Sequence, residues 1–188
     1  MCAPLKELRN MSAHDLLVYC GQEENVPVDL NAILKKVGIS ALPRDFSEIE
    51  KKVNSPIEIL GAIVMEGDSA AIFYNKKYRE DSHRCRFTVA HELAHCCLSH
   101  ECLNDEVHVD FRLANKDHPE NMEEEEEKAA NIFAGELLIP YNKLSEVISK
   151  LLQPSVHILA DIFDVSDNVM LKRLKHLELP NRIYGYNC

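Results

Sequence analysis

The segment HELAH at residues 91–95 constrains this chain more than any other, because it forms the pattern H-E-x-x-H inside a predicted helix over about residues 82–99. Residues four apart stand on one helical face, with Cβ atoms about 5–6 Å apart. Two imidazoles so placed, those of His91 and His95, can bind one zinc ion at Zn–N distances of about 2.0–2.1 Å. Glu92 lies beside this face, where a carboxylate can accept a proton from a zinc-bound water. The alternative is a buried helix whose histidines are ordinary core residues.

A catalytic zinc site needs a third protein ligand and an open position. The extended pattern H-E-x-x-H-x-x-G-x-x-H is not present, since Leu98 and Glu101 stand where it requires glycine and histidine. The third ligand should therefore come from a later element, and a predicted acidic helix over residues 122–138 is the obvious source. Three of its glutamates fall near its buried face: Glu123, Glu126 and Glu127. Spacing alone does not choose among these three, whereas Glu124 and Glu125 point away as solvated residues that complement the helix dipole.

Three cysteines and a histidine close to H-E-x-x-H offer another interpretation of metal binding. Cys96, Cys97 and Cys102 with His100 could form a thiolate site, but the sequence has no C-x-x-C pair. Small buried side chains on a crowded helix are the favoured interpretation. The seven cysteines are an odd number and two are adjacent, which indicates reduced thiols and a cytoplasmic protein.

Two segments together resemble the ImmA/IrrE family of metallo-endopeptidases. They are RFTVAHELAH at residues 86–95 and EKAANIFAGELLIP at residues 127–140, and the resemblance covers roughly residues 60–178. It implies that one zinc ion per chain is bound by two histidines and one glutamate, namely His91, His95 and Glu127. It implies that Glu92 is the general base. It also implies an α+β, zincin-like fold with a small sheet, an active-site helix, a second ligand-bearing helix and a helical C-terminal extension.

Asn131 stands one helical turn after Glu127 in the second of these segments. The resulting E-x-x-x-N arrangement is similar to the E-x-x-x-D of thermolysin-like enzymes, whose aspartate supports a ligand histidine. By that analogy, Asn131 accepts the far N–H of a ligand histidine and fixes the orientation of its ring. The alternative is a polar residue that satisfies the backbone of a neighbouring loop.

Proteins that resemble the ImmA/IrrE family cut transcriptional repressors, often those of phages, mobile elements or stress regulons. The resemblance therefore implies a zinc-dependent endopeptidase that cleaves a helix-turn-helix repressor by attack of a zinc-bound water, with Glu92 passing the proton to the leaving amine. A further oxyanion donor is expected, and three residues qualify by type only: Tyr141, His108 and His118. The main alternative is a module that binds a repressor without cutting it, which would not need a general base.

Residues 155–178 have the pattern of a helix-turn-helix, so a DNA-binding regulator is the third candidate function. Residues 155–188 contain four acidic and four basic residues, however, and the whole chain has a net charge of −10. This balance argues against nucleic acid as a direct partner. We favour a metallopeptidase domain at residues 1–150 and a helical pair at residues 151–188 packed on it, in which Arg173 could equally hold an acidic partner segment.

The remaining pattern predicts the elements around these motifs. Capped helices are expected at residues 12–21 and 29–37, and a hairpin at residues 57–75. The hairpin offers a possible edge strand for an extended substrate segment. Residues 101–121 have the composition of a long loop. No stretch approaches the roughly 18 apolar residues of a membrane span, so we expect no membrane partner.

Overall fold

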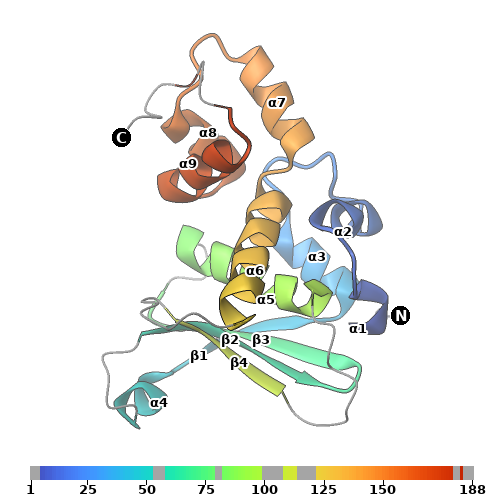
Figure 1. The fold of residues 1–188 in the computed structure, drawn as a ribbon, viewed down its shortest axis with the longest axis vertical. Coiled ribbons are helices and arrows are strands. Elements are labelled where there is room, and N and C mark those ends of the chain that lie inside the picture. Colours follow the sequence, from blue (N-terminus) through green and yellow to red (C-terminus); the bar gives the residue numbers. More distant parts are fainter. Residues whose placement is uncertain are drawn as a thin grey trace.

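The computed structural model describes residues 5–52, 58–78, 82–98, 108–113, 122–179 and 183. Within these ranges the chain forms nine helices and one four-stranded sheet, which is an α+β architecture (Figure 1). No helix in the described ranges is both long and apolar enough to cross a membrane.

Three short helices begin the described chain: α1 (Leu5–Leu8), α2 (Ala13–Cys20) and α3 (Leu30–Val37). Helix α2 starts at a capping box, in which Ser12 Oγ accepts a hydrogen bond from Asp15 N at 3.1 Å and Asp15 Oδ2 accepts one from Ser12 N at 3.0 Å. Gly21 and Gly38 end α2 and α3 in the left-handed conformation, with φ of 64° and 76°. Both predicted helices are therefore confirmed.

The sheet consists of four strands: β1 (Ser40–Arg44), β2 (Ile59–Glu66), β3 (Ser69–Asn75) and β4 (His108–Leu113). Their order is β1-β3-β2-β4, with β1 parallel to β3 and the other pairs antiparallel. The predicted hairpin is confirmed as β2 and β3, but it occupies the middle of the sheet. The expectation that it offers an edge strand is wrong, because β1 and β4 pair with its two outer sides.

Strand β4 lies within residues 101–121, which we expected to be a loop. Its sequence HVDFRL alternates apolar and polar residues, as a strand with one solvated face does. The strand pairs with β2, and the Phe111 ring packs edge-on against Phe46 with centroids 6.3 Å apart. The loop expectation is thus wrong for residues 108–113, and the rest of the segment lies outside the described residues.

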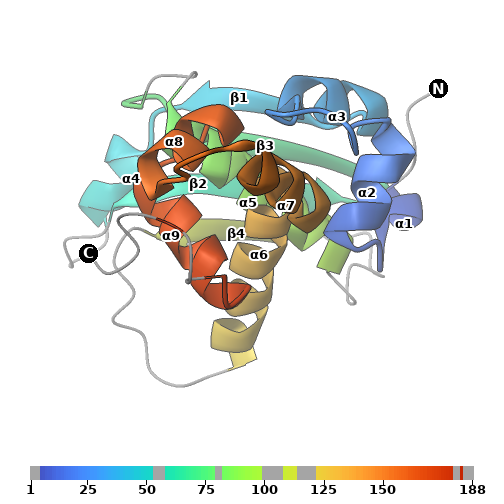
Figure 2. The same ribbon diagram turned by 90° about the horizontal axis from the view of Figure 1, so that it is seen from above.

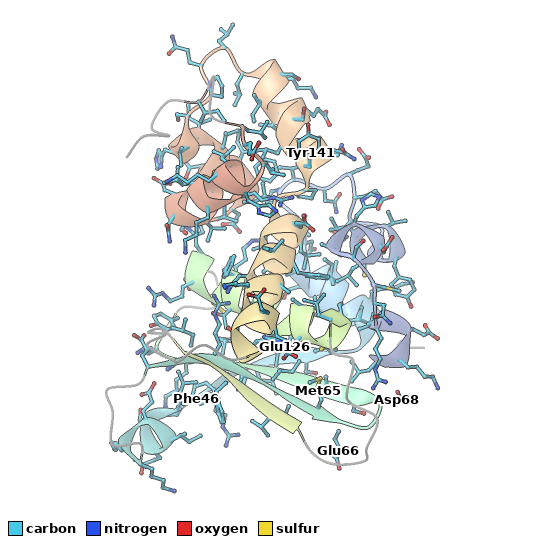
Figure 3. The ribbon with its side chains drawn as sticks, viewed as in Figure 1. Phe46, Met65, Glu66, Asp68, Glu126 and Tyr141 are labelled. Carbon is cyan, nitrogen blue, oxygen red and sulfur yellow. The ribbon has the colours of Figure 1, made fainter. Side chains whose placement is uncertain are left out.

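Of two longer helices, α5 (His83–Leu98) lies on one face of the sheet and α6 (Met122–Leu138) packs on α5, with its lower end near the strands (Figure 1). The predicted helices at these positions are confirmed. Sheet residues Ile63, Met65 and Ile72 are buried in the main core, which they share with both helices. The other face of the sheet carries a smaller core around Phe46, next to α4 (Ser47–Lys52) (Figure 3). Helix α5 contacts the central strands and α6, so it is enclosed on nearly all sides.

Three further helices follow α6: α7 (Tyr141–Lys150), α8 (Val156–Phe163) and α9 (Asp167–His176). They lie toward the C-terminal end of α6, away from the sheet (Figures 1 and 2). Arg173 of α9 is only 5% exposed; its Nε donates to Ile139 O at 3.2 Å and its Nη1 lies 3.3 Å from Glu136 Oε1. Arg173 is therefore engaged inside the protein, and the expectation that it could hold an acidic partner segment is wrong.

Asp164 connects the turn between α8 and α9 to α5. Its backbone is left-handed, with φ of 53°, and its N–H caps α8. Its carboxylate lies 3.3 Å from His83 Nε2 and 3.4 Å from Arg86 Nε, both in the first turn of α5. Asp164 and Arg173 thus attach the helical pair to α5 and α6, respectively. The division of the chain at residue 150 into two domains stays a prediction.

Candidate metal centre

Helix α5 places the H-E-x-x-H residues in the interior of the protein. Its first turn is capped by Ser82, whose Oγ accepts a hydrogen bond from Cys85 N at 3.1 Å. His91 is 0% exposed, Glu92 1% and His95 9%. Buried polar side chains require partners, so these three residues are held where each needs a specific neighbour. A helix whose histidines were ordinary core residues would not bring another ionisable group to them.

Glu127 of α6 is that neighbour. The two imidazoles approach each other with His91 Nε2 and His95 Nε2 3.1 Å apart. Glu127 Oε1 lies 3.5 Å from His91 Nε2 and 3.3 Å from His95 Nε2. Ligands of a tetrahedral zinc at about 2.0–2.2 Å from the metal are separated by about 3.3–3.6 Å. Two of the three separations lie in this range and the third, between the histidine nitrogens, is 3.1 Å, so the donor atoms match a zinc ion in chemical type and closely in spacing. Among the described residues they form the group that could hold a metal.

His91 is in the protonation state that binds metals. Burial is the largest cause that lowers the pKa of His91, to about 4, although the Glu127 carboxylate acts in the opposite direction. The imidazole is therefore neutral near pH 7, and a neutral imidazole offers a nitrogen lone pair to a metal. Its other nitrogen, Nδ1, is buried and has no hydrogen-bond partner in the described part of the chain.

Glu92 lies outside the group of three donors, against strand β2. A Cβ atom on Gly61 would lie 2.4 Å from Thr88 Cγ2, 2.9 Å from Phe73 O and 3.4 Å from Glu92 Oε1. Position 61 must therefore be glycine for α5 to approach the sheet so closely. This glycine gives the Glu92 carboxylate its place between the helix and the sheet.

The other acidic residues of α6 do not join the group. Glu125 and Glu126 are exposed, and Glu125 pairs with Lys128 at 3.2 Å. Figure 3 shows Glu126 at the end of α6 nearest the sheet. The side chains of Glu123 and Glu124 lie outside the described structure. Of the three glutamates that helical spacing left open, the structure thus brings Glu127 to the histidines.

The cysteines of α5 are core residues. Cys96 and Cys97 are 3% and 0% exposed, and burial raises the pKa of the Cys97 thiol to about 12. A thiol with so high a pKa stays protonated, and only a thiolate is a good metal ligand. Cys102 and His100, the other members of the alternative thiolate site, lie outside the described residues.

Asn131 has different partners from the one we predicted. Its Nδ2 donates to Glu127 O at 2.8 Å, and its Oδ1 accepts from Arg112 Nη2 at 3.4 Å. Neither partner is a histidine nitrogen, so Asn131 contacts the backbone of one candidate ligand rather than the ring of another. Its role beside a metal stays a prediction.

Arg112 is the residue that sequence reasoning missed at this site. It belongs to β4, and burial lowers its pKa while the carboxylates of Glu92 and Glu127 oppose that effect. The alternation in HVDFRL would place Arg112 on the solvated face opposite Phe111, yet Arg112 contacts Phe87 and Asn131 while Phe111 is 38% exposed, so this local pattern does not predict its position.

Of the oxyanion candidates, Tyr141 is excluded by its position. It is 50% exposed and lies at the other end of α6 from Glu126 (Figure 3). His108 begins β4, but its side chain lies outside the described structure, as does all of His118.

A comparison with protein families shows to which group this chain belongs. The Peptidase_M78 family model, described as the IrrE N-terminal-like domain, matches residues 58–175. This chain is a member of the ImmA/IrrE peptidase family. The match covers more than half of the chain, and it confirms both the predicted family and the zincin-like, α+β fold class. None of the curated proteins matches this ImmA/IrrE-type metallopeptidase.

Proposed function

We propose that this chain is a zinc-dependent endopeptidase. The observation that carries the proposal is the convergence of His91 Nε2, His95 Nε2 and Glu127 Oε1 within 3.1–3.5 Å of one another. A second carboxylate, that of Glu92, is buried on α5 next to His91. Two neutral imidazoles, one carboxylate and an additional buried carboxylate are the residues that metal-dependent hydrolysis of a peptide bond requires.

Each of these residues has a separate task in the proposed reaction. His91, His95 and Glu127 would hold one zinc ion per chain. The ion would supply Lewis acidity, which polarises the scissile carbonyl and lowers the pKa of water to about 7. A Glu92 carboxylate oxygen would accept a proton from the attacking water and then give it to the nitrogen of the leaving amine. Gly61 supports this task, because its missing side chain lets α5 approach the sheet, with Thr88 closest and the Glu92 carboxylate next to it.

The proposed substrate is a helix-turn-helix transcriptional repressor of a phage, mobile element or stress regulon, cut in the cytoplasm. Membership of the ImmA/IrrE family supports this class of substrate. A module that only binds the repressor would have no use for a buried Glu92 beside a set of ligands. A DNA-binding role is disfavoured because α9 has few basic residues and one of them, Arg173, is buried against Glu136 and Ile139.

The substitution Glu92→Gln tests the proposal against the binding module. The amide keeps the shape of the side chain but cannot accept the proton, so cleavage should fall by about 10²–10⁴-fold while zinc and repressor binding remain. The substrate is the helix-turn-helix repressor encoded closest to the gene for this chain, with cleavage followed by intact mass spectrometry and zinc by elemental analysis.

Glu126→Gln is the matched control, since it is the same substitution of glutamate by glutamine at an exposed position. This variant should cleave like the wild type. If the wild-type protein binds both zinc and the repressor but leaves the repressor intact, the chain is a binding module and not a peptidase. Equal cleavage by Glu92→Gln and wild type would remove Glu92 as the general base.

A further inference from the structure

Arg112 lies where the sheet comes closest to the H-E-x-x-H helix. In the antiparallel pair of β2 and β4 it stands opposite Gly61, the residue that makes room for Glu92. Paired residues of an antiparallel sheet direct their side chains to the same face. The Arg112 side chain therefore rises from the edge strand on the face covered by α5 and α6.

The guanidinium of Arg112 contacts both helices that carry the candidate ligands. On α5, its Nη1 donates to Phe87 O at 3.5 Å and its Cζ lies 4.8 Å from the centre of the Phe87 ring. On α6, its Nη2 donates to Asn131 Oδ1 at 3.4 Å. Phe87 stands one helical turn before His91, and Asn131 stands one turn after Glu127. Arg112 thus bridges the two helices at the level of the metal ligands.

The contact to α6 reaches the candidate ligand Glu127 through Asn131. Asn131 uses its amide nitrogen to bind Glu127 O at 2.8 Å, which leaves its Oδ1 for the guanidinium. A guanidinium presents several N–H donors in one plane, so it can hold Phe87 O and Asn131 Oδ1 at the same time. A lysine ammonium carries the same charge without this planar fork.

Arg112 also brings a positive charge to a group with two buried or half-buried carboxylates. Its charge acts on His91, Glu92 and Glu127, three of the four residues proposed for the site. Charges removed from water need a partner of opposite sign. A nearby cation also repels a metal ion, however, so its charge and its contacts have opposite effects on metal affinity, and the two effects can be separated.

We propose that Arg112 is a positioning residue for the metal centre: it fixes the distance between α5 and α6 through Phe87 and Asn131, and so holds Glu127 against the two histidines. The inference rests on the metal site of the proposed function. It does not require that the substrate be known.

The test measures zinc affinity, by competition with a chromophoric chelator, in variants of the full chain. Arg112→Met and Arg112→Lys should each weaken zinc binding by about 10–100-fold, the usual effect of changing a residue that orients a ligand. The Co²⁺-loaded variants should also show a visible spectrum different from that of the wild type, because the ligand geometry changes. Arg112→Lys keeps the positive charge, so weaker zinc binding by this variant would show that the planar contacts of the guanidinium are what hold the site.

Arg44→Met is the matched control. Arg44 lies on the opposite edge strand, β1, and its guanidinium also stacks on a phenylalanine, with Cζ 5.5 Å from the centre of the Phe73 ring. It is exposed and has no contact with α5 or α6 in the described contacts of its side chain. Its removal should leave zinc affinity and the Co²⁺ spectrum as in the wild type.

Asn131→Ala provides a second route to the same answer if Arg112→Met does not fold. It should weaken zinc binding in the same direction, and the double variant with Arg112→Lys should lose less than the sum of the two single losses, because both changes break one contact. Additive losses, or zinc affinity in Arg112→Met equal to or above that of the wild type, would overturn the inference. Wild-type protein that binds no zinc would overturn the proposed function itself, and this inference with it.

Discussion

The C-terminal end of α6 is anchored in the core by Leu137 and Leu138, both 0% exposed, whereas its N-terminal end exposes Glu125 and Glu126 and half-buries Glu127. Figure 3 shows the two ends, with Glu126 near the sheet and Tyr141 just beyond the other end. One helix thus has an anchored end in the core and a site end beside the histidines. We call these the anchor end and the site end of α6.

An arginine from a distant element contacts each end of α6, and the two contacts differ in kind. At the anchor end, Arg173 donates to a backbone oxygen, Ile139 O, at 3.2 Å and pairs with Glu136. At the site end, Arg112 reaches the side chain of Asn131 at 3.4 Å. Anchoring one end by its backbone leaves the other end to be adjusted by side chains, which is where a carboxylate has to meet its partners.

The comparison predicts the largest difference for a pair of glutamates on α6. Glu127→Ala, at the site end, should lose well over 100-fold in zinc affinity. Replacing a residue that only contacts a metal ligand already lowers metal affinity by about 10–100-fold. Glu136→Ala, at the anchor end, should keep its zinc and lose about 1–3 kcal/mol of stability, because it removes the carboxylate partner of the buried Arg173 guanidinium. Elemental analysis and urea unfolding measure the two effects. Zinc retained by Glu127→Ala would show that the third ligand is elsewhere.

His91 of α5, which faces the site end of α6, should make the metal-free protein sensitive to pH. The pKa of His91 is lowered to about 4 from an ordinary value of 6.5, so between these pH values the unfolded chain binds a proton that the folded chain does not. Stability should therefore fall as the pH decreases through this window, by up to about 3 kcal/mol. Urea unfolding of the wild type and His91→Gln at pH 7 and pH 4.5 isolates this contribution, which the variant should lack.

His157→Gln is the control for that experiment because it should act with the opposite sign. His157 is exposed on α8, and its hydrogen bond to Asp167 raises its pKa. Its stabilising effect is therefore present at low pH and is lost as the pH rises. A wild type and a His91→Gln variant with the same pH dependence would show that burial of His91 does not disfavour its protonation.

Two glycines, one beside the sheet and one in α6, should change the stability of the protein in opposite directions. Gly61→Ala places a Cβ 2.4 Å from Thr88 Cγ2 and 2.9 Å from Phe73 O, so overpacking should destabilise the protein by about 1–3 kcal/mol and displace Glu92. In Gly135→Ala, at the anchor end, the nearest atom would be Arg173 Cδ at 3.8 Å, an ordinary contact. Removing this glycine from a helix interior should stabilise the protein by about 0.5–1 kcal/mol. Thermal unfolding measures both, and a stable Gly61→Ala would mean that α5 can move from the sheet.

Local sequence patterns were sufficient for the elements that depend on local interactions. The H-E-x-x-H spacing placed two histidines on one face of α5, and the Ser12 and Gly21 caps marked both ends of α2. The predicted bounds of the acidic helix, residues 122–138, are those of α6. Such signals arise within one turn of a helix, so the sequence contains them in full.

The features that depend on contacts between distant segments were missed or misinterpreted. Strand β1 contains Pro43 and forms because it pairs in parallel with β3, which no local pattern indicates. Arg112 reaches the site only because β4 pairs with β2. Arg173 was expected on a surface, yet Met170 and Leu174 flank it on the same helical face, and this spacing could have predicted its burial.

Asp164 is subject to two requirements that together limit which residues evolution can place there. Its left-handed backbone, with φ of 53°, favours glycine or asparagine, while its carboxylate faces His83 and Arg86 of α5. Glycine would satisfy the backbone and lose both contacts, and glutamate would keep the charge on a backbone that it adopts poorly. Aspartate meets both requirements, so we expect few substitutions to be accepted at this position among sequences that keep the same turn between α8 and α9.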